Sequence, residues 1–479
     1  MEEKNDKKFV QQLTDINKDL SQWYTDVIIK ADLCDYGPVK GTMIIKPYAY
    51  EIWEHIQEFL NKEFKKVGVK NAYFPMFIPE SYLKREAEHV EGFAPEVAVV
   101  TYAGGQELAE KLIVRPTSET IICEMFSKWI KSYRDLPMVM NQWCNVVRWE
   151  KATRPFLRTS EFLWQEGHTV QASAEDAHKD AIKMLNIYIK MCKELLAMPV
   201  LSGQKSEREK FAGANATYGI EAVLRDGKCL QAGTTHDLGT NFAKASNIKF
   251  LNKNGEWEYG YSTSWGVSTR LIGAVIMTHG DERGIKLPPA IAPIQTVIVP
   301  IAQHKPGVLD KVNEIANKLK EQNVRVFVDD TDASAGWKFN QWEMKGVPMR
   351  LEIGPRDIDN NQAVIVRRDT HEKIVVSLDG IEDTIKQLMK NIQENLYNIS
   401  LEFVKNNSRD VLTMDDMVKC INNKHVAMAY HCGCEECEQQ IKDETGIQSR
   451  VIIENAVNGE NCIHCGKKAK YKAYFAKQY

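Results

Sequence analysis

A group of charged and aromatic residues between positions 148 and 169, RWEKATRPFLRTSEFLWQEGHT, carries the strongest chemical signal in the sequence. The segment reads as a strand, a polar loop and a second strand, so we expect Arg148 and Arg158 to face one pocket. Guanidinium groups are permanently charged and bind phosphate oxygens in pairs, which suits a clamp for a polyphosphate. Glu150 can accept hydrogen bonds from an adenine amino group, and Phe162 offers a flat face for a base. The alternative is a surface hairpin with solvated charges.

A second signal is a group of cysteines near the end of the sequence, at Cys432, Cys434, Cys437, Cys462 and Cys465. A structural zinc ion takes four thiolates or imidazoles, usually as two short-spaced pairs separated by a longer loop. Cys462 and Cys465 form one C-x-x-C pair, and Cys437 pairs with either Cys432 or Cys434. His431 and His464 are alternative ligands. In a reducing compartment this spacing predicts a metal site rather than disulfides.

Three segments resemble, in order, the three signature motifs of class II aminoacyl-tRNA synthetases. GVKNAYFP at 68–75 matches the glycine-to-proline spacing of the first motif. The 148–169 hairpin matches the second through Arg-x-Glu and Arg-x-x-x-Phe. GVSTR at 266–270 resembles the third, although generic third motifs carry glutamate where this chain has Thr269.

Further segments resemble the prolyl-tRNA synthetases in particular. WGVSTR has the local form seen in that family, and matching stretches follow in order: HVEGFAPEVA (89–98), RPTSET (115–120), EKFAGA (209–214), LQAGTTHDLGTNF (230–242) and LPPAIAP (287–293). The resemblance covers essentially the whole chain. It implies a proline–tRNA ligase that activates L-proline with ATP and transfers it from prolyl-adenylate to the 3′ end of tRNA(Pro).

The resemblance also implies a nucleotide site. Arg148 would hold the α-phosphate and the proline carboxylate, while Arg158 and Arg270 would hold the outer phosphates, and these three arginines are the expected catalytic residues. The expected ATP-binding set is Arg148, Glu150, Arg158, Thr159, Phe162, Gln231, Thr234, Ser268 and Arg270. Within it, Gln231, Thr234 and Ser268 would contact ribose or ATP-bound Mg²⁺. Adenylation is an in-line attack by the substrate carboxylate, so the enzyme contributes alignment and charge stabilisation rather than a nucleophile.

For proline, the resemblance implies that Thr117 and Glu119 meet the imino nitrogen, where a carboxylate suits a cationic group. Arg148 would contact the proline carboxylate. The pyrrolidine ring would be enclosed by Phe93, Trp164, His168, Phe211 and His236. Taken alone, each histidine would more often be a hydrogen-bonded structural residue, and only the surrounding motifs favour a binding role.

Residues 336–357, GWKFNQWEMKGVPMRLEIGPRD, resemble the anticodon-binding domain that prolyl, threonyl, histidyl and glycyl enzymes share. Single-stranded bases offer their edges to polar side chains, so the candidates are Lys338, Glu343, Arg350, Glu352 and Arg356. Several of these could instead pair with each other. In the cysteine cluster the family uses the wider spacing, which favours a structural Zn²⁺ on Cys432, Cys437, Cys462 and Cys465 and leaves Cys434 as a spare.

Two other functions compete with this interpretation. A non-catalytic synthetase-like regulator that binds tRNA would have lost the phosphate-clamping arginines. A threonyl enzyme would need a cysteine and two histidines on an active-site zinc. Some bacterial prolyl enzymes carry a large hydrolytic domain between the second and third motifs, but the stretch from His168 to Gly266 leaves no room for one.

The elements that must position these residues can be read from the hydrophobic pattern. Residues 43–67 have apolar side chains at helical spacing, and Gly68 ends that helix. A mostly β stretch runs from residue 113 to residue 150, and residues 174–198 form a long amphipathic helix. From Thr296 short strands alternate with helices, which predicts a small α/β domain with a largely parallel sheet.

The length of 479 residues predicts about three domains. By the resemblance these are an α+β catalytic domain (1–290) with an antiparallel class II sheet flanked by helices, an α/β anticodon-binding domain (291–395) and a small α/β zinc-binding domain (396–479). The first motif resembles a dimer-forming one, so a homodimer is expected. With no secretory signal and no apolar run near ~20 residues, we expect a cytoplasmic protein without membrane contact. The net charge of −3 does not exclude tRNA, because phosphates respond to local patches.

Overall fold

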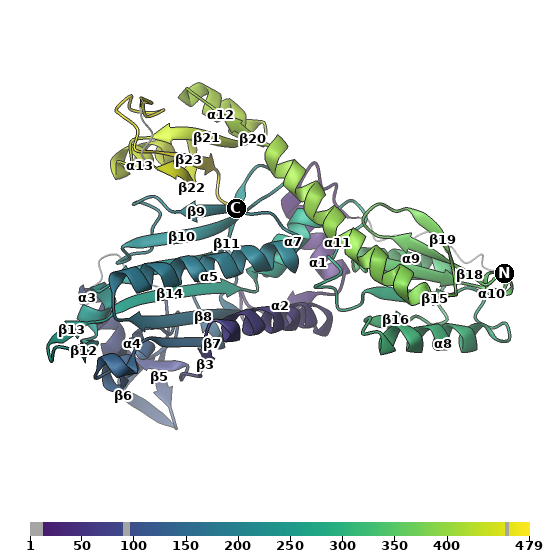
Figure 1. The fold of residues 1–479 in the computed structure, drawn as a ribbon, viewed down its shortest axis with the longest axis horizontal. Helices are drawn as coiled ribbons and strands as arrows, with labels where there is room; N and C mark the ends of the chain where they lie inside the picture. Colours follow the sequence, from purple (N-terminus) through teal and green to yellow (C-terminus); the bar gives the residue numbers. More distant parts are fainter. Residues whose placement is uncertain (1–12, 90–95, 456–458) are drawn as a thin grey trace.

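The computed structural model describes residues 13–89, 96–455 and 459–479 (Figure 1). Three parts follow one another along the chain. The first is built on a large sheet, the second is a smaller sheet with helices around it, and the third is a small sheet beside the edge of the first (Figure 1). The long helix α11 (Ile381–Asn406) runs from the second part to the third. Within the described ranges, no helix combines the length and hydropathy needed to span a bilayer.

The first part contains most of the helices. These are α1 (Leu20–Lys30), α2 (Pro47–Lys66), α3 (Glu80–His89), α4 (Glu119–Trp129), η1 (Tyr133–Asp135), α5 (Ala174–Glu194), α6 (Asn241–Ala245) and α7 (Arg270–His279). Its strands are β1 (Cys34–Tyr36), β2 (Met43–Ile45), β3 (Lys70–Asn71), β4 (Phe77–Pro79), β5 (Ala98–Ala103), β6 (Gln106–Val114), β7 (Met138–Val147), β8 (Glu161–Gln171), β9 (Leu201–Gln204), β10 (Ala216–Val223), β11 (Cys229–Gly239), β12 (Lys249–Leu251), β13 (Trp257–Tyr259) and β14 (Tyr261–Ser268).

Seven of these strands form the central sheet, in the order β3-β7-β8-β14-β11-β10-β9. Every neighbouring pair is antiparallel except β3 and β7, which are parallel. The expected antiparallel sheet flanked by helices is therefore confirmed, with one parallel edge strand. Helices α1, α2, α5 and α7 contribute buried side chains such as Trp23, Trp53 and Tyr188 to one large core with this sheet.

The ends of two helices follow simple local rules. Helix α2 starts at Pro47, where the missing N–H costs nothing, and it ends before Gly68, whose φ of 84° suits glycine. Helix α5 starts after Ser173, whose hydroxyl accepts a hydrogen bond from the Asp176 N–H at 3.1 Å. It ends at Glu194, four residues before the predicted end at 198, and Ala197 beyond it has a positive φ of 49°.

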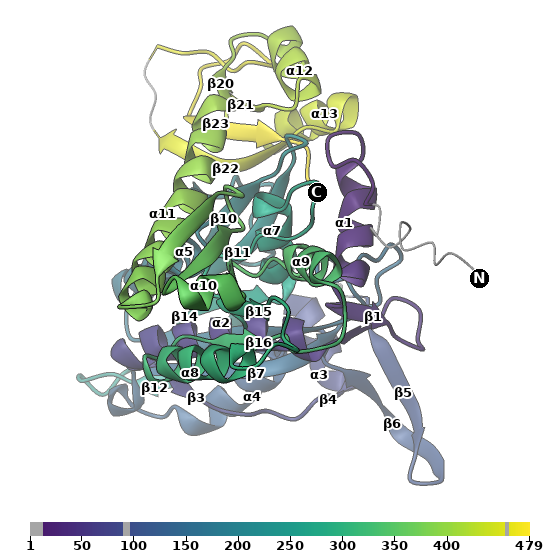
Figure 2. The ribbon, with the colours of Figure 1, turned by 90° about the vertical axis from the view of Figure 1, so that its right-hand side faces the viewer.

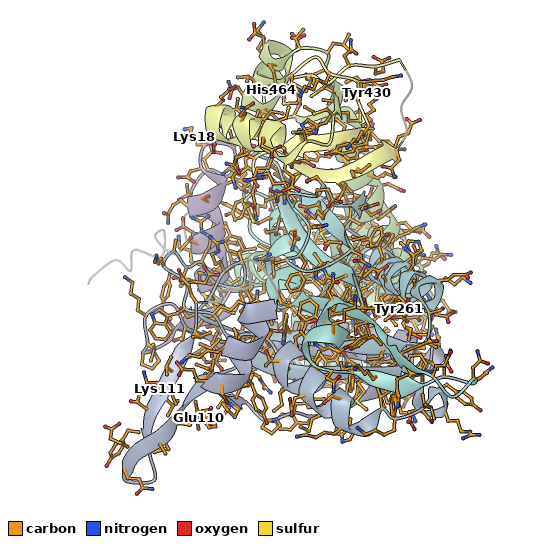
Figure 3. All side chains as sticks on the ribbon, turned by 90° about the vertical axis from the view of Figure 1, so that its left-hand side faces the viewer. Lys18, Glu110, Lys111, Tyr261, Tyr430 and His464 are labelled. Carbon is orange, nitrogen blue, oxygen red and sulfur yellow. The ribbon has the colours of Figure 1, made fainter. Side chains whose placement is uncertain are left out.

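One predicted stretch needs correction. The region from residue 113 to residue 150 was expected to be mostly β, yet α4 lies between β6 and β7. Glu119 is the first residue of α4, so the side chains of residues 116–119 are positioned by the start of a helix rather than by a strand. Strands β4, β6 and β5 form a separate sheet, and the β5–β6 hairpin projects away from the body (Figure 2). Glu110 and Lys111 lie on this hairpin, far from His464 in the third part (Figure 3).

The second part has a five-stranded sheet in the order β16-β15-β17-β18-β19. Its elements are β15 (Thr296–Pro300), α8 (Val308–Glu321), β16 (Val326–Val328), α9 (Ala335–Met344), β17 (Met349–Ile353), α10 (Pro355–Asp359), β18 (Gln362–Arg367) and β19 (Lys373–Ser377). Strand β15 is parallel to β16 and β17, but β18 and β19 are antiparallel additions. The predicted α/β class holds, whereas a largely parallel sheet was wrong. The short connections after β17 and β18 return the chain without a crossover helix long enough for parallel pairing.

The third part contains β20 (Ser408–Asp410), α12 (Met414–Asn422), β21 (Val426–His431), α13 (Glu435–Thr445), β22 (Gln448–Asn455) and β23 (Tyr471–Ala476). Its sheet has the order β20-β21-β23-β22. Helix α11 continues to Asn406 and so crosses the expected domain boundary at residue 395. This third part lies beside β9 and β10 of the central sheet (Figure 1), and Tyr479 packs against the large core of the first part.

Candidate active site and metal cluster

One face of the central sheet carries a cavity of about 570 Å³. Most of the predicted site residues line it: Thr117, Glu119, Arg148, Phe162, Trp164, His168, Phe211, Gln231, Thr234, His236, Ser268 and Arg270. The predicted residues Glu150, Arg158 and Thr159 do not line it. Phe93 lies outside the described residues.

Strand periodicity explains how the lining is assembled. Alternate residues of a strand point to the same face, so Phe162, Trp164, Glu166 and His168 of β8 all reach the cavity. Ser264, Gly266 and Ser268 of β14 follow the same rule.

Strand β11 follows that alternation only after an irregularity. Gly233 pairs with Ile220, and Gln231 pairs with the next residue, Glu221, so Ala232 is an extra residue in the ladder. This bulge brings Gln231 to the same face as Thr234, although the two positions are three residues apart.

Two arginines line the cavity. The Arg148 Nε donates to the carbonyl of Pro116 at 3.0 Å, and its guanidinium lies 5.5 Å and 5.3 Å from the ring centres of Phe162 and Trp164. Arg270 donates to the carbonyl of Leu157 at 2.9 Å. Both guanidiniums are therefore fixed by backbone carbonyls rather than by carboxylates.

Burial first, and then the charges of Arg148 and Arg158, lower the pKa of Arg270 to about 10. Burial likewise lowers the pKa of Arg148. A buried guanidinium whose pKa is lowered by neighbouring cations forms a site prepared for an anion. The hairpin residue Arg158 is exposed, with its Nε 3.4 Å from Glu150 Oε2. Thr159 is buried and donates to the carbonyl of Glu161 at 2.6 Å.

The part of the lining beyond Trp164 along β8 is acidic, and it lies close enough to Arg148 for the charge of Glu166 to raise the pKa of that arginine against the effect of burial. Glu166 Oε2 accepts from the Ser118 N–H at 3.0 Å and lies 3.0 Å from His168 Nε2. Burial alone would raise the pKa of Glu166, but the hydrogen bond and charge of His168, together with hydrogen bonds from Ser118, lower it to about 2. His168 Nδ1 in turn faces Glu119 Oε1 at 4.0 Å. A buried histidine is thus held between two buried carboxylates.

A third part of the lining is aromatic. His236 lies in ring contact with Phe211, at 4.7 Å between centres. Its two ring nitrogens hydrogen-bond with Thr217 Oγ1 at 3.0 Å and Thr234 Oγ1 at 3.1 Å. Burial, and after it the charge of His168, lowers the pKa of His236 to about 3, so the ring is neutral at physiological pH. The cavity lining therefore combines guanidinium groups, buried carboxylates and aromatic rings.

Sequence reasoning did not name Glu166, Thr217 and Ser264 as site residues. Glu166 could have been found, because it occupies the same alternating positions of β8 as Trp164 and His168. Thr217 and Ser264 carry no comparable signal, since a threonine or serine in a strand is common on either face.

The anticodon candidates of the second part are mostly paired with one another. The guanidinium of Arg350 contacts Glu343 at 3.0 Å and Glu352 at 2.9 Å and lies 3.9 Å from the ring centre of Phe339. Lys338 is buried and donates to the carbonyl of Asp329 at 2.8 Å. Arg356, at the start of α10, is exposed.

The third part brings its cysteines together. His431, Cys432, Cys437 and Cys462 offer ligand atoms that all lie within 4.8 Å of one another. Cys437 Sγ lies 3.8 Å from Cys462 Sγ, and Cys465 Sγ lies 3.6 Å from Cys432 Sγ. Thiolates 2.3 Å from a tetrahedral ion would be roughly 3.8 Å apart, so these spacings fit a zinc ion. Three of the predicted ligands, Cys432, Cys437 and Cys462, belong to the cluster, but its fourth member is His431, while the predicted Cys465 is exposed beside it. The Cys434 thiol instead donates to Glu436 at 2.7 Å.

The last residues return to the first part. The Tyr479 N–H donates to the carbonyl of Cys229 at 3.1 Å, at the start of β11. The hydroxyl of Tyr479 hydrogen-bonds with Arg154 Nη1, and the ring of Tyr479 lies 5.5 Å from the Arg154 guanidinium. Arg154 belongs to the loop between β7 and β8, so the tail is in contact with the hairpin that carries Arg148.

Three family models match this chain. Residues 100–279 match the tRNA synthetase class II core domain (G, H, P, S and T), and residues 295–388 match an anticodon binding domain. Residues 414–479 match a model described as prolyl-tRNA synthetase, C-terminal. The three matches fall in turn on the three parts of the fold.

Full-length relatives are also similar. A protein of Alkaliphilus oremlandii named proline–tRNA ligase is 58% identical, over 99% of this chain and 100% of its own length. A protein of the same name from Acetoanaerobium sticklandii is 56% identical with the same coverage. Proline–tRNA ligase 2 of Clostridioides difficile is 55% identical, again over 99% of this chain and 100% of its own.

Proposed function

The chain belongs to the prolyl-tRNA synthetase family and is an ATP-dependent proline–tRNA ligase, and we propose that the cavity on the central sheet is where it forms prolyl-adenylate. The observation that carries the proposal is the set of charges that line this cavity. Two buried guanidiniums with lowered pKa and a pair of buried carboxylates line the same cavity, with Glu166 close enough to Arg148 for its charge to raise the pKa of that arginine against the effect of burial. An amino acid between ATP and these carboxylates would present its carboxylate to the arginines and its ammonium to the carboxylates.

In this proposal the arginines hold the phosphates. Arg148 contacts both the α-phosphate and the proline carboxylate, which aligns the attacking oxygen with phosphorus. Arg270, and Arg158 swung inward from its contact with Glu150, hold the outer phosphates and stabilise the charge that pyrophosphate gains. Mg²⁺ enters with the phosphates, because it prefers oxygen ligands and bridges phosphate groups. Gln231, Thr234 and Ser268 face it or the ribose.

The 148–169 hairpin supplies the proposed binding site for the adenine base. The ring of Phe162 is the proposed stacking surface for adenine, and Glu150 accepts from the adenine amino group. Thr159 takes part indirectly, because its hydroxyl caps the start of β8 through the carbonyl of Glu161. The ring of Phe162 also packs against the Arg148 guanidinium, so the proposed adenine site and α-phosphate site are in direct contact.

Proline is proposed to lie beside the buried carboxylates. Thr117 and Glu119 meet the secondary ammonium, and His168 is held against Glu119 by Glu166. The ring is enclosed by Trp164, Phe211 and His236, with Phe93 as a further candidate. A neutral His236 presents an uncharged edge to the ring, which suits an apolar substrate surface.

Three further features of the family are proposals for this chain. Zn²⁺ is held by Cys432, Cys437 and Cys462, which cluster with His431, and by Cys465, with His431 as the alternative fourth ligand. The ion acts as a structural one, because none of these residues lines the cavity. Arg356 and the exposed ring of Trp337 offer groups for anticodon bases, while Lys338, Glu343, Arg350 and Glu352 shape the surface beneath. Two copies associate through the first-motif surface, where Tyr73 is 73% exposed and Phe77 is 45% exposed.

A cytoplasmic location is proposed because all eleven cysteines are free thiols, as expected in a reducing compartment. Residues 169–265, all of them described, form α5, α6 and strands of the sheets, with no inserted domain between the second and third motifs. A pocket for proline discriminates weakly against smaller amino acids, because one methylene changes binding by only ~1–3 kcal/mol. We therefore propose that alanine is activated and that preformed alanyl-tRNA(Pro) is not hydrolysed faster with this protein than without it.

The proposed site is tested by replacing Arg148 with Ala and measuring proline-dependent ATP–pyrophosphate exchange. The expected loss is a factor of ~10²–10³, because a charge that acts in the transition state is removed. Arg134→Ala, an exposed arginine outside the cavity, is the matched control and should exchange normally. A folded Arg148→Ala variant with near-normal exchange would show that the reaction takes place elsewhere.

A further inference from the structure

The segment 205–211, in which Glu209, Lys210 and Phe211 line the cavity, is in contact with the third part of the chain. Ser206 Oγ donates to Glu438 Oε1 at 2.9 Å, and both residues are buried. Glu438 belongs to the first turn of α13 and directly follows Cys437 of the metal cluster. Arg208 Nε donates to Gln439 Oε1 at 2.8 Å beside it. The helix that carries a cysteine of the cluster therefore binds the segment that leads into the cavity.

A buried ion triad joins the same two parts. Glu221 of β10 is fully buried, and its two carboxylate oxygens contact the ammonium of Lys205 and, at 2.8 Å, Nη2 of Arg450. Lys205 precedes Ser206, whereas Arg450 comes from β22 of the third part. Removing every partner of a buried charge strongly lowers stability, because the remaining ion is left unpaired in a medium of low polarity.

The backbone around Arg450 is shaped for this contact. The register of β22 against β23 shifts between Ser449 and Ile452, so Arg450 lies at an irregularity of the ladder. At Gly203 of β9, a Cβ would lie 2.5 Å from the carbonyl oxygen of Ile452. The two backbones approach so closely that only glycine fits at this position. The third part is thereby seated directly on the edge strand of the central sheet.

The segment that carries Ser206 continues along the chain into the cavity lining. The carbonyl of Ser206 accepts from the N–H groups of Glu209 at 3.1 Å and Lys210 at 3.0 Å, which closes a tight turn. The Phe211 N–H then donates to Thr217 Oγ1 at 2.9 Å, and the same hydroxyl bonds to His236. An unbroken series of short contacts thus runs from α13 to the two rings that enclose the apolar part of the cavity.

We propose that Glu438 and Arg450 are positioning residues for the amino-acid pocket, through which the metal-bearing third part fixes the place of Phe211. This inference rests on the proposed function, since it takes the cavity wall to be the proline site. Neither residue touches substrate. Glu438 acts through Ser206, and Arg450 acts through Glu221 and Lys205. The contacts of Ser206 lead to Phe211 and not to the arginines, so the Glu438 contact tunes affinity for proline and not for ATP. Glu221 also pairs with Gln231 and acts on Arg270 through its charge, so Arg450 supports both substrates.

The test measures KM for proline and KM for ATP in pyrophosphate exchange, with the full zinc-loaded chain. Ser206→Ala and Glu438→Ala should each raise the proline KM about tenfold while the ATP KM changes by less than about twofold. The double variant should be no worse than the worse single variant, because both remove one contact. Glu435→Ala, at an exposed carboxylate in the same turn of α13, is the matched control and should behave as the parent.

Two further variants separate the outcomes. Arg450→Met leaves Glu221 paired with Lys205 and should also raise the proline KM, with zinc content unchanged. The selectivity test is confined to the Ser206 and Glu438 variants, because Glu221 also acts on Arg270. Phe211→Ala should raise the proline KM by itself. If Phe211→Ala does so while the Ser206 and Glu438 variants keep the parent's proline KM, the positioning role is overturned and the proposed pocket stands. If Phe211→Ala also leaves the proline KM unchanged, the pocket assignment fails and this inference fails with it. Equal rises in both KM values for the Ser206 and Glu438 variants would overturn selective positioning as well.

Discussion

Arg270→Met separates a catalytic role of the arginine pair from a structural one. In the folded protein Arg270 makes two hydrogen bonds, to the carbonyls of Leu157 at 2.9 Å and Gln231 at 3.2 Å. Losing them costs about 0.5–1.5 kcal/mol each. This loss of stability is opposed by a gain, because the variant no longer buries the charge of Arg270. The pKa of Arg270 is lowered from 12.5 to about 10, by burial and then by Arg148 and Arg158. At 1.36 kcal/mol per pH unit this corresponds to about 3 kcal/mol of unfavourable free energy.

The two effects nearly cancel, so the variant should unfold within a few degrees of the parent. Catalysis should respond very differently. Removing a preorganised charge that stabilises the leaving pyrophosphate costs about 2.7–4 kcal/mol, a factor of ~10²–10³ in kcat/KM for exchange. The assay pairs thermal unfolding with proline-dependent pyrophosphate exchange, and Arg134→Met, which is exposed, serves as the control. The reasoning is refuted if exchange falls by less than about threefold, or if stability collapses together with activity.

The other predictions concern the metal, the tail and the buried carboxylate of Glu166. Cys432→Ser should lose most of the zinc of the purified chain while Cys434→Ser keeps it, because the Cys434 thiol points to Glu436; equal losses would disprove the ligand choice. Deleting Tyr479 should slow aminoacylation and leave zinc content unchanged, and an unaltered rate would make the tail a mere surface end. The pKa of Glu166 is about 2 when folded and 4.5 ordinarily, so its stabilisation is complete above about pH 4.5 and is lost as the pH falls through about 2. Glu166→Gln should therefore flatten acid unfolding between about pH 5 and 2, and an unchanged acid slope would contradict this.

The site could be predicted largely where local pattern and resemblance agree. The β8 positions Phe162, Trp164 and His168 follow strand alternation, and the structure brings them to one cavity. Gln231 shows the limit of periodicity. Only the bulge at Ala232 turns it to the face of Thr234, and nothing in the local sequence requires a bulge there. Its inclusion depended on the resemblance alone.

Other features depend on contacts between distant residues. Arg158 was expected to face the same pocket as Arg148, but its exposed guanidinium lies 3.4 Å from Glu150 and does not line the cavity. The seating of the third part depends on Glu221 and Arg450, which are far apart in sequence and ordinary in composition. The second part is fixed to the first by Arg368, which contacts Asp281 at 2.6 Å and 2.8 Å. Pairing of this kind is a property of the folded chain and leaves no local pattern.

Pyrophosphate exchange measured with each standard amino acid in turn, followed by aminoacylation of tRNA(Pro), tests the central claim most directly. Proline should support the fastest exchange, alanine a slower but detectable rate, and only the proline reaction should charge tRNA(Pro) efficiently. Preferred exchange with threonine would contradict the assignment of the pocket. A well-folded protein that exchanges with no amino acid, although Arg148 and Arg270 are both present, would contradict the account of the site as catalytic.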